Sequence, residues 1–293
     1  MKKRILCFIL IIICALSGCS RKNTEAYIDN VLTKNIRFKF SNIVDNSIQF
    51  QLKNILSNYG VSQNSISTFI NYIKLFYTAK YPNIIENGYS NTDIESFNKD
   101  LYPIEDSLEH WRHLGYNENY LDINCRVAAF TLIKDLISIK NKKTIEILDD
   151  KLLSTNSLLN WNKKTKNDYS TLYGNIPINE KSNSQNTINQ IKAYLDKNIE
   201  FDNNNDMSSV VIYVKESNND FAQVAHASIT IQTKQGIYMI EKYNPQEPYQ
   251  MSLFEKGEDI ISYLISRFNE AKLNSVENIF VFNNNECVFA LNK

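Results

Sequence analysis

Glycine is scarce in this sequence, with only 7 among the 293 residues. Neither a Gly-x-x-x-x-Gly-Lys nor a Gly-x-Gly-x-x-Gly pattern occurs, and such loops are what cradle nucleotide phosphates. A net charge is lacking as well, because 32 Lys and Arg balance 32 Asp and Glu. A nucleic-acid-binding protein would be expected to carry a basic excess. We therefore expect no nucleic-acid partner and no nucleotide cofactor.

Long apolar runs are missing except for one at the N-terminus, where a basic stretch precedes residues 5–16. That run is shorter than the roughly 20 residues that span a bilayer, so it predicts a signal peptide over residues 1–18. The ending Leu16-Ser17-Gly18-Cys19 resembles the lipobox of bacterial lipoproteins. The resemblance implies that Cys19 carries fatty acyl chains such as palmitate and that residues 19–26 form a tether. An ordinary cleaved signal or an uncleaved anchor is the alternative.

The rest of the chain, residues 27–293, predicts a single α+β domain. Residues 27–204 are mainly helical, because apolar side chains recur at steps of three and four. Residues 205–293 change to a period of two, which is typical of an antiparallel sheet. We expect strands at 209–215, 224–232, 237–242, 278–282 and 286–291. We expect helices at 66–77, from a cap at Asp122 or Asn124 through an apolar stripe ending at Ile137, from Thr144 to Leu152, at 187–195 and at 252–273. Residues 162–186 are polar and predict a long surface connection.

Two thiols, Cys125 and Cys287, would belong to the mature domain, since the other cysteines lie in the signal peptide or at the lipidation site. In an extracellular setting the two could form a disulfide. However, Cys287 alternates with Phe289 and Leu291 on one strand face, which indicates a place in the core.

Cys125 follows Asn124 and precedes an apolar periodic run, which places it at the start of a helix. The positive end of the helix dipole lowers the pKa of a thiol there and makes thiolate available near neutral pH. Arg126 would add a fixed positive charge beside it. The alternative is a small, buried, inert cysteine, because free cysteine is among the most buried residue types.

A base for Cys125 would come from His226, which lies near the start of a predicted strand. If the following turn centres on residues 234–235, residue 226 lies opposite residue 243, and Glu241 projects on the same face as the imidazole. A carboxylate can thus orient the base, with Asn244 as the alternative third residue. His226 could also be an ordinary hydrogen-bonded strand histidine, and Glu241 a solvated charge.

The order of a cysteine at a helix start, a histidine on a strand and a polar residue on the next strand resembles papain-like cysteine hydrolases. Three stretches together resemble a bacterial lipoprotein family with domain of unknown function 4300. They are residues 110–116 continuing to 124–126, residues 225–227, and residues 240–242 with 247–250. The resemblance implies a papain-like architecture, a helical half packed on a C-terminal sheet. No glutamine stands just before Cys125 to complete an oxyanion hole, so Asn124, Asn119, Tyr116 or the backbone N–H of Cys125 would serve.

His110 and His113 form a competing constellation, because a three-residue spacing puts both on one helix face. With Cys125 or Glu109 they could ligate zinc, but the His-Glu-x-x-His pattern is absent. There are two other interpretations: the histidines pack at a helix end, or His113 supports the cysteine. We expect no metal.

These observations predict a cysteine hydrolase held on the outer face of the cell membrane by the lipid on Cys19. Its nucleophile would be Cys125, and its substrate a peptide or a peptidoglycan stem. No cofactor would be needed. The rival hypothesis is a surface lipoprotein that binds a ligand on the same fold without turnover.

Overall fold

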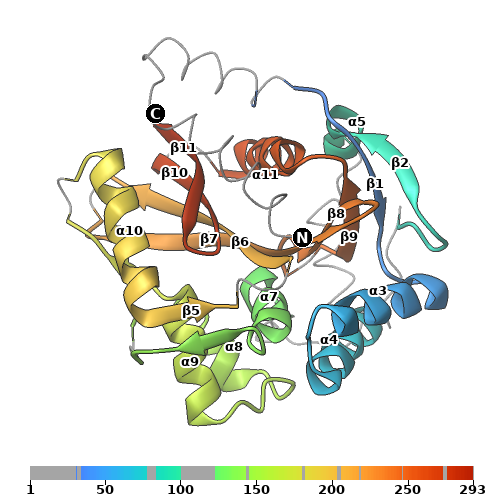
Figure 1. Cartoon of the computed structure of the whole chain (residues 1–293), viewed down its shortest axis with the longest axis horizontal. Coiled ribbons are helices and arrows are strands. Elements are labelled where there is room, and N and C mark those ends of the chain that lie inside the picture. The colour runs from blue at the N-terminus through green and yellow to red at the C-terminus, as the bar shows by residue number, and fades with distance from the viewer. Residues whose placement is uncertain are drawn as a thin grey trace, which may run out of the picture.

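A large antiparallel sheet with helices on both faces forms the centre of the molecule (Figure 1). The computed structural model describes residues 31, 34–77, 84–99, 123–142, 145–179, 182–202, 206–217, 219–245, 247–272 and 276–292. Within this part of the chain there are eight helices and two sheets. None of the helices described has both the length and the apolar composition needed to cross a membrane.

The main sheet has nine strands, eight of which follow the order β11-β10-β6-β7-β8-β9-β1-β2. Neighbouring strands are antiparallel throughout. Their bounds are β1 Arg37–Ser41, β2 Ser90–Asp93, β6 Met207–Glu216, β7 Phe221–Thr233, β8 Gly236–Lys242, β9 Tyr249–Phe254, β10 Val276–Asn283 and β11 Glu286–Asn292. The ninth, β4 (Ile176–Pro177), pairs with β7, while β3 (Ile137–Ile139) and β5 (Ile199–Phe201) form a separate two-stranded sheet.

Most of the longer helices begin at polar caps that the sequence supplies. The side chains of Asp45, Ser62, Asn162 and Asn183 each accept a bond from a first-turn N–H, which satisfies a donor that the helix itself leaves unpaired. The helices are α3 Asn46–Asn58, α4 Gln63–Phe76, α5 Ile94–Lys99, α7 Cys125–Ile133, α8 Asp150–Thr155, α9 Lys163–Tyr173, α10 Ser184–Asn198 and α11 Gly257–Lys272.

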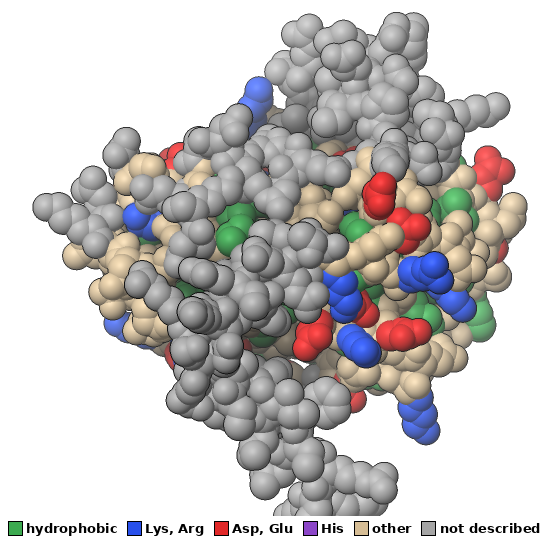
Figure 2. Space-filling view, turned by 90° about the horizontal axis from the view of Figure 1, so that it is seen from above, with side chains coloured by type: hydrophobic (Ala, Val, Ile, Leu, Met, Phe, Trp, Pro, Cys, Tyr) green, Lys and Arg blue, Asp and Glu red, His purple; other side chains and the backbone are tan. Residues whose placement is uncertain are grey.

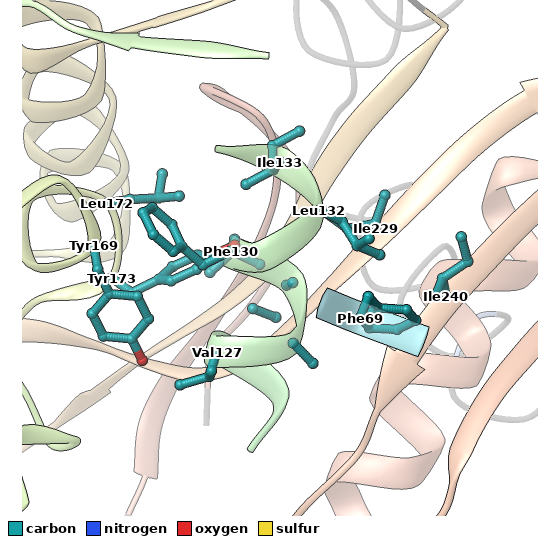
Figure 3. Close-up of a cluster of buried hydrophobic side chains, with 14 of the residues drawn as sticks. Phe69, Val127, Phe130, Leu132, Ile133, Tyr169, Leu172, Tyr173, Ile229 and Ile240 are labelled. Carbon is teal, nitrogen blue, oxygen red and sulfur yellow. The ribbon is translucent and has the colours of Figure 1, made fainter. Parts of the chain in front are cut away.

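Two hydrophobic cores lie on opposite faces of the sheet. The α7-side core contains side chains from α3, α4, α7, α9 and one face of β7 and β8, among them Phe69, Phe130, Ile229 and Ile240. Figure 3 shows Tyr169, Leu172 and Tyr173 on one side of α7 and Phe69 and Ile240 on the other. The α11-side core contains side chains from β1, α5, α11 and the other sheet face, among them Phe38, Met239, Tyr263 and Phe289. Helix α7 is therefore buried nearly all round, as an apolar helix in a core should be.

The prediction of helices combined with a C-terminal antiparallel sheet is confirmed, and so are both hairpins. Strands β7 and β8 join through Lys234 and Gln235, with Ile229 opposite Ile240, which is the register expected from that turn. Strands β10 and β11 join through Asn284 and Asn285, and Asn284 takes the positive φ of 52° that the tight turn requires. The helix at residues 187–195 is present within α10.

Several boundaries were predicted wrongly. The N-terminal part contributes β1 and β2 to the main sheet, so the helices and strands are not fully separated along the chain. Residues 162–186 contain α9 and β4 instead of a long connection, because Asn162 caps a helix whose buried face carries Tyr169 and Tyr173. Residues 145–149 are not helical, and helix α8 begins only at Asp150.

Two further corrections concern where helices and strands meet. Helix α7 ends at Ile133, and Ile137 lies in β3, so the apolar stripe does not continue as one helix. Residues 252–254 belong to β9, and α11 begins at Gly257. In each place a short strand with apolar side chains lies next to the helix, so periodicity alone does not separate the two.

Cys287 lies on a different face from the one predicted. Val281 pairs with Phe289 but Phe282 pairs with Cys287, so β11 has a bulge at Val288 that reverses the alternation. Cys287 is half-buried against the α7-side core, whereas Phe289 lies in the α11-side core. Cys125 and Cys287 are both free thiols, so the disulfide is absent.

The described surface carries charges of both signs. In the space-filling view, Lys and Arg side chains lie interspersed with Asp and Glu side chains over one face (Figure 2). In the part of this face that the structure describes, acidic and basic side chains are therefore not gathered into separate regions.

Candidate active site

Cys125 is the first residue of α7, and Asn124 caps the helix in front of it. The Asn124 side-chain oxygen accepts a 3.0 Å bond from the Val127 N–H, and the Asn124 carbonyl accepts a 3.0 Å bond from the Ala128 N–H. The backbone N–H groups of Cys125 and Arg126 have no acceptor within the described part of the chain. The thiol, 4% exposed, thus sits at the positive end of a buried helix.

A buried carboxylate, Asp149, holds the residues on both sides of the cysteine. Its Oδ1 accepts bonds of 2.6 Å from Asn124 Nδ2 and from Arg126 Nη2. Its Oδ2 accepts a 2.6 Å bond from Arg126 Nε and another from the Tyr169 hydroxyl. Burial would raise the pKa of Asp149, but Arg126, Tyr169 and Asn124 lower it, so the carboxylate is ionised.

His226 and Glu241 are in direct contact, as was predicted from their positions on the same face of neighbouring strands. His226 Nε2 lies 2.8 Å from Glu241 Oε2, and the other Glu241 oxygen accepts a 2.5 Å bond from the Tyr263 hydroxyl of α11. Gln250 in turn donates to the same hydroxyl at 3.1 Å. His226 is 2% exposed and Glu241 is 3% exposed, so this pair forms in a water-poor setting where electrostatic contacts are strong.

The histidine reaches the cysteine where β7 and β8 stop pairing. The ladder between these strands runs from Thr233 to Ile229 and ends before His226, while α7 packs on both strands. The His226 imidazole and the backbone N–H of Ala227 both lie near enough to the Cys125 thiol to lower its pKa. Glu241 occupies Nε2, and Nδ1 has no hydrogen-bond partner among the described residues, so Nδ1 is the ring nitrogen available to Cys125.

The two groups shift one another's pKa toward an ion pair. Burial would raise the pKa of the Cys125 thiol, but the nearby His226, the charge of Arg126 and the Ala227 N–H lower it below the ordinary 9.0. Burial would lower the pKa of His226, but Cys125 and Glu241 raise it to about 9. Both shifts favour the thiolate–imidazolium pair over the neutral thiol and imidazole.

A second group of contacts surrounds the imidazole. The Tyr243 ring lies 4.9 Å from the His226 ring, centroid to centroid, and the Arg267 guanidinium lies 4.1 Å from the Tyr243 ring centroid. Arg267 forms an ion pair with Glu247. The Asn244 side chain donates to Glu247 at 2.6 Å and accepts from its N–H at 2.9 Å. Glu241, and not Asn244, is therefore the group bonded to the base, while Asn244 shapes the turn after β8.

The structure brings four of the predicted residues together: Cys125, Arg126, His226 and Glu241. Asn124, expected as an oxyanion donor, uses its amide to bind Asp149 and to cap α7, so it positions the helix instead. The other predicted residues, Tyr116, Asn119, His110, His113 and Cys19, lie outside the described residues. Across the described ranges no group of three His, Cys, Asp or Glu side chains is placed to hold a metal ion.

Sequence reasoning missed Asp149, Tyr169 and Tyr263. In the sequence Asp149 looks like the cap of the helix that follows it, and the two tyrosines look like members of apolar helix faces. Only the tertiary fold carries them to the site. A buried tyrosine needs a partner for its hydroxyl, which is the one general signal that could have directed attention to them.

Comparison with family models of known proteins places the chain in a family. The model of a family described as a domain of unknown function (DUF4300) matches residues 39–288. This range contains all the described residues that form the site. No curated protein and no solved structure matches the chain.

Proposed function

The chain belongs to the DUF4300 family, and from its site we propose that it is a papain-like cysteine hydrolase that cleaves an amide bond. One observation carries the proposal: Glu241 binds His226 through Nε2 and leaves Nδ1, buried and without a hydrogen-bond partner among the described residues, available to Cys125 at the start of α7. A nucleophile, a base and a group that orients the base are the parts that covalent acyl transfer needs.

In the reaction we propose, the Cys125 thiolate attacks the carbonyl carbon and forms a carbon–sulfur bond. The His226 imidazolium then gives its Nδ1 proton to the leaving nitrogen as the carbon–nitrogen bond breaks, which releases an amine and leaves a thioester. Neutral His226 next takes a proton from water, the water oxygen attacks the thioester, and the carbon–sulfur bond breaks. Glu241 keeps the imidazole in place and stabilises its positive charge in the first step.

The negative charge that develops on the carbonyl oxygen during the attack needs hydrogen-bond donors beside the Cys125 sulfur. The N–H groups of Cys125 and Arg126 suit this role, because capping satisfies the N–H groups of Val127 and Ala128 and leaves the first two available. Each such donor contributes on the order of 3 kcal/mol to lowering the barrier in comparable sites.

Location and substrate are part of the same proposal. The basic and apolar start of the chain and the Leu16-Ser17-Gly18-Cys19 sequence support a lipid anchor at Cys19 on the outer face of the cell membrane. An amide hydrolase held there would meet peptides and the stem peptides of the cell wall. We therefore propose one of these as the substrate.

A direct test is to incubate the protein with purified cell-wall peptides and to follow newly released amines by mass spectrometry. The wild type and Cys287→Ala should release the same products, and Cys125→Ala should release none. A peptide chloromethyl ketone should add its mass to Cys125 alone. If Cys125→Ala releases amine as fast as the wild type, the proposal is wrong.

Burial of the site favours a second candidate, a lipoprotein that binds a ligand without turnover. Cys125, His226 and Glu241 are each at most 4% exposed, as groups in a purely structural ion network would be. In that case wild type and Cys125→Ala would bind the same cell-wall fragments with equal affinity, and neither would release an amine.

A further inference from the structure

We propose that Asp149 is a positioning residue of this site, which fixes the first turn of α7 and thereby holds the Cys125 sulfur against His226. The inference rests on the proposed function, in which that sulfur is the nucleophile. No pattern in the sequence marks Asp149. Its role follows from the residues that donate its four hydrogen bonds, which are Asn124, Arg126 and Tyr169.

Asp149 binds the two neighbours of the nucleophile at once. Asn124 precedes Cys125 and Arg126 follows it, and both donate to the same carboxylate at 2.6 Å. With the Tyr169 hydroxyl, each carboxylate oxygen accepts two bonds, so the group is fully satisfied although it is only 5% exposed. The position of the helix start is thereby fixed on both sides of the sulfur, and charge-assisted bonds of this kind are strong and directional.

The same arrangement ties the nucleophile to the strand of the base. Arg126, held by Asp149, donates through Nη1 to the Val224 carbonyl of β7 at 3.0 Å. Val224 stands two residues before His226 on that strand. A continuous path of hydrogen bonds thus runs from Asp149 through Arg126 to the strand that carries His226.

Asp149 does not perform the task that its sequence position would suggest. It stands at the N-cap of α8, where an aspartate usually accepts a bond from a first-turn N–H, yet its side chain makes no such bond. A cap of this type typically contributes about 0.5–2 kcal/mol to stability. The carboxylate is instead directed at α7, which a role confined to α8 does not explain.

The test measures the rate at which iodoacetamide modifies Cys125 between pH 5 and 9, with site-resolved mass spectrometry on the intact protein. Asp149→Asn has nearly the same shape but removes the ion pair with Arg126 and leaves the Arg126 guanidinium held only by the Val224 carbonyl. We expect the rate at pH 6 to fall about tenfold and the midpoint of the pH profile to rise by about one unit. Tyr169→Phe keeps the ion pair, so its rate should fall only about twofold to threefold.

Asp259→Asn serves as the matched control. It also breaks an aspartate ion pair, with Lys34 at 2.5 Å, but on α11 and without contact with Cys125. Its alkylation profile should equal that of the wild type, even where its thermal stability is lower.

Three results would overturn the inference. The first is an Asp149→Asn profile that superimposes on the wild-type profile despite lower thermal stability, which would limit Asp149 to stabilising the fold. The second is a midpoint that moves downward, which would mean that only the charge of Asp149 acts on the thiol. The third result matters if Asp149→Asn does not fold. In that case, an alkylation profile of Tyr169→Phe identical to that of the wild type contradicts the inference. A wild-type Cys125 no more reactive at pH 6 than Cys287 is a separate outcome, because it contradicts the proposed function itself.

Discussion

Replacing Glu241 with Gln should lower the pKa of His226 while leaving the fold nearly unchanged. The wild-type imidazole, with a pKa of about 9, is held protonated by Cys125 and Glu241 against the effect of burial. A hydrogen bond to a charged group contributes about 1.5–3 kcal/mol, and one pKa unit corresponds to about 1.4 kcal/mol. Loss of the carboxylate should therefore lower the pKa of His226 by about one to two units, to roughly 7 to 8.

The assay is an NMR titration of protein labelled with ¹⁵N-histidine. The sequence contains only 3 His, so His226→Asn assigns the signal by its disappearance. Glu200→Gln, an exposed carboxylate on β5, is the control and should leave the titration unchanged. A decrease of less than half a unit in Glu241→Gln, or an equal decrease in Glu200→Gln, would show that the 2.8 Å contact with Glu241 does not maintain the imidazolium.

Three further predictions concern reactivity, backbone strain and location. At pH 7 iodoacetamide should modify Cys125 faster than the more exposed Cys287. The reason is that burial raises the pKa of Cys287 to about 12, whereas the pKa of Cys125 is lowered. Equal rates of modification would contradict this prediction. Gly236→Ala should lower the free energy of unfolding by about 1–3 kcal/mol in urea titrations, because its φ is +138° and a Cβ would lie 2.5 Å from a backbone oxygen. Gly257→Ala, whose Cβ would have no neighbour closer than 3.9 Å, should lower the free energy of unfolding by less. Equal decreases in the two variants would contradict the strain expected at position 236. Cys19→Ala should abolish labelling by radioactive palmitate and release the protein from the membrane fraction, and retained label would exclude Cys19 as the lipidation site.

The contact between His226 and Glu241 could be predicted from the sequence because it depends on short-range rules. A two-residue turn fixes the register of a hairpin, and the alternation of side chains then decides which residues share a face. The cap at Asn124 was predictable for the same reason, since a helix start is signalled by the residues beside it. Both features involve elements that are neighbours along the chain.

The rest of the site depends on contacts between distant elements, for which the sequence offers no local signal. Asp149 is bonded to Arg126 of α7 and to Tyr169 of α9, and Tyr263 reaches Glu241 from a helix on the other sheet face. The bulge at Val288 made a prediction based on local alternation fail, because a single extra residue placed Cys287 on the other face of the sheet. Strand β1 was missed because it pairs with β9, which is more than two hundred residues away along the chain.

The pairing of Cys125 with His226 also makes the thiol a reporter of complete folding. Every cause that lowers its pKa, apart from the adjacent Arg126, is a group brought from β7 by tertiary structure. Glu241, which holds the base, is in turn bonded by α11 from the opposite core. An unfolded or half-folded chain therefore carries an ordinary, slow-reacting cysteine. Rapid alkylation of Cys125 during refolding would mark the moment when both cores have closed on the sheet, without any spectroscopic label.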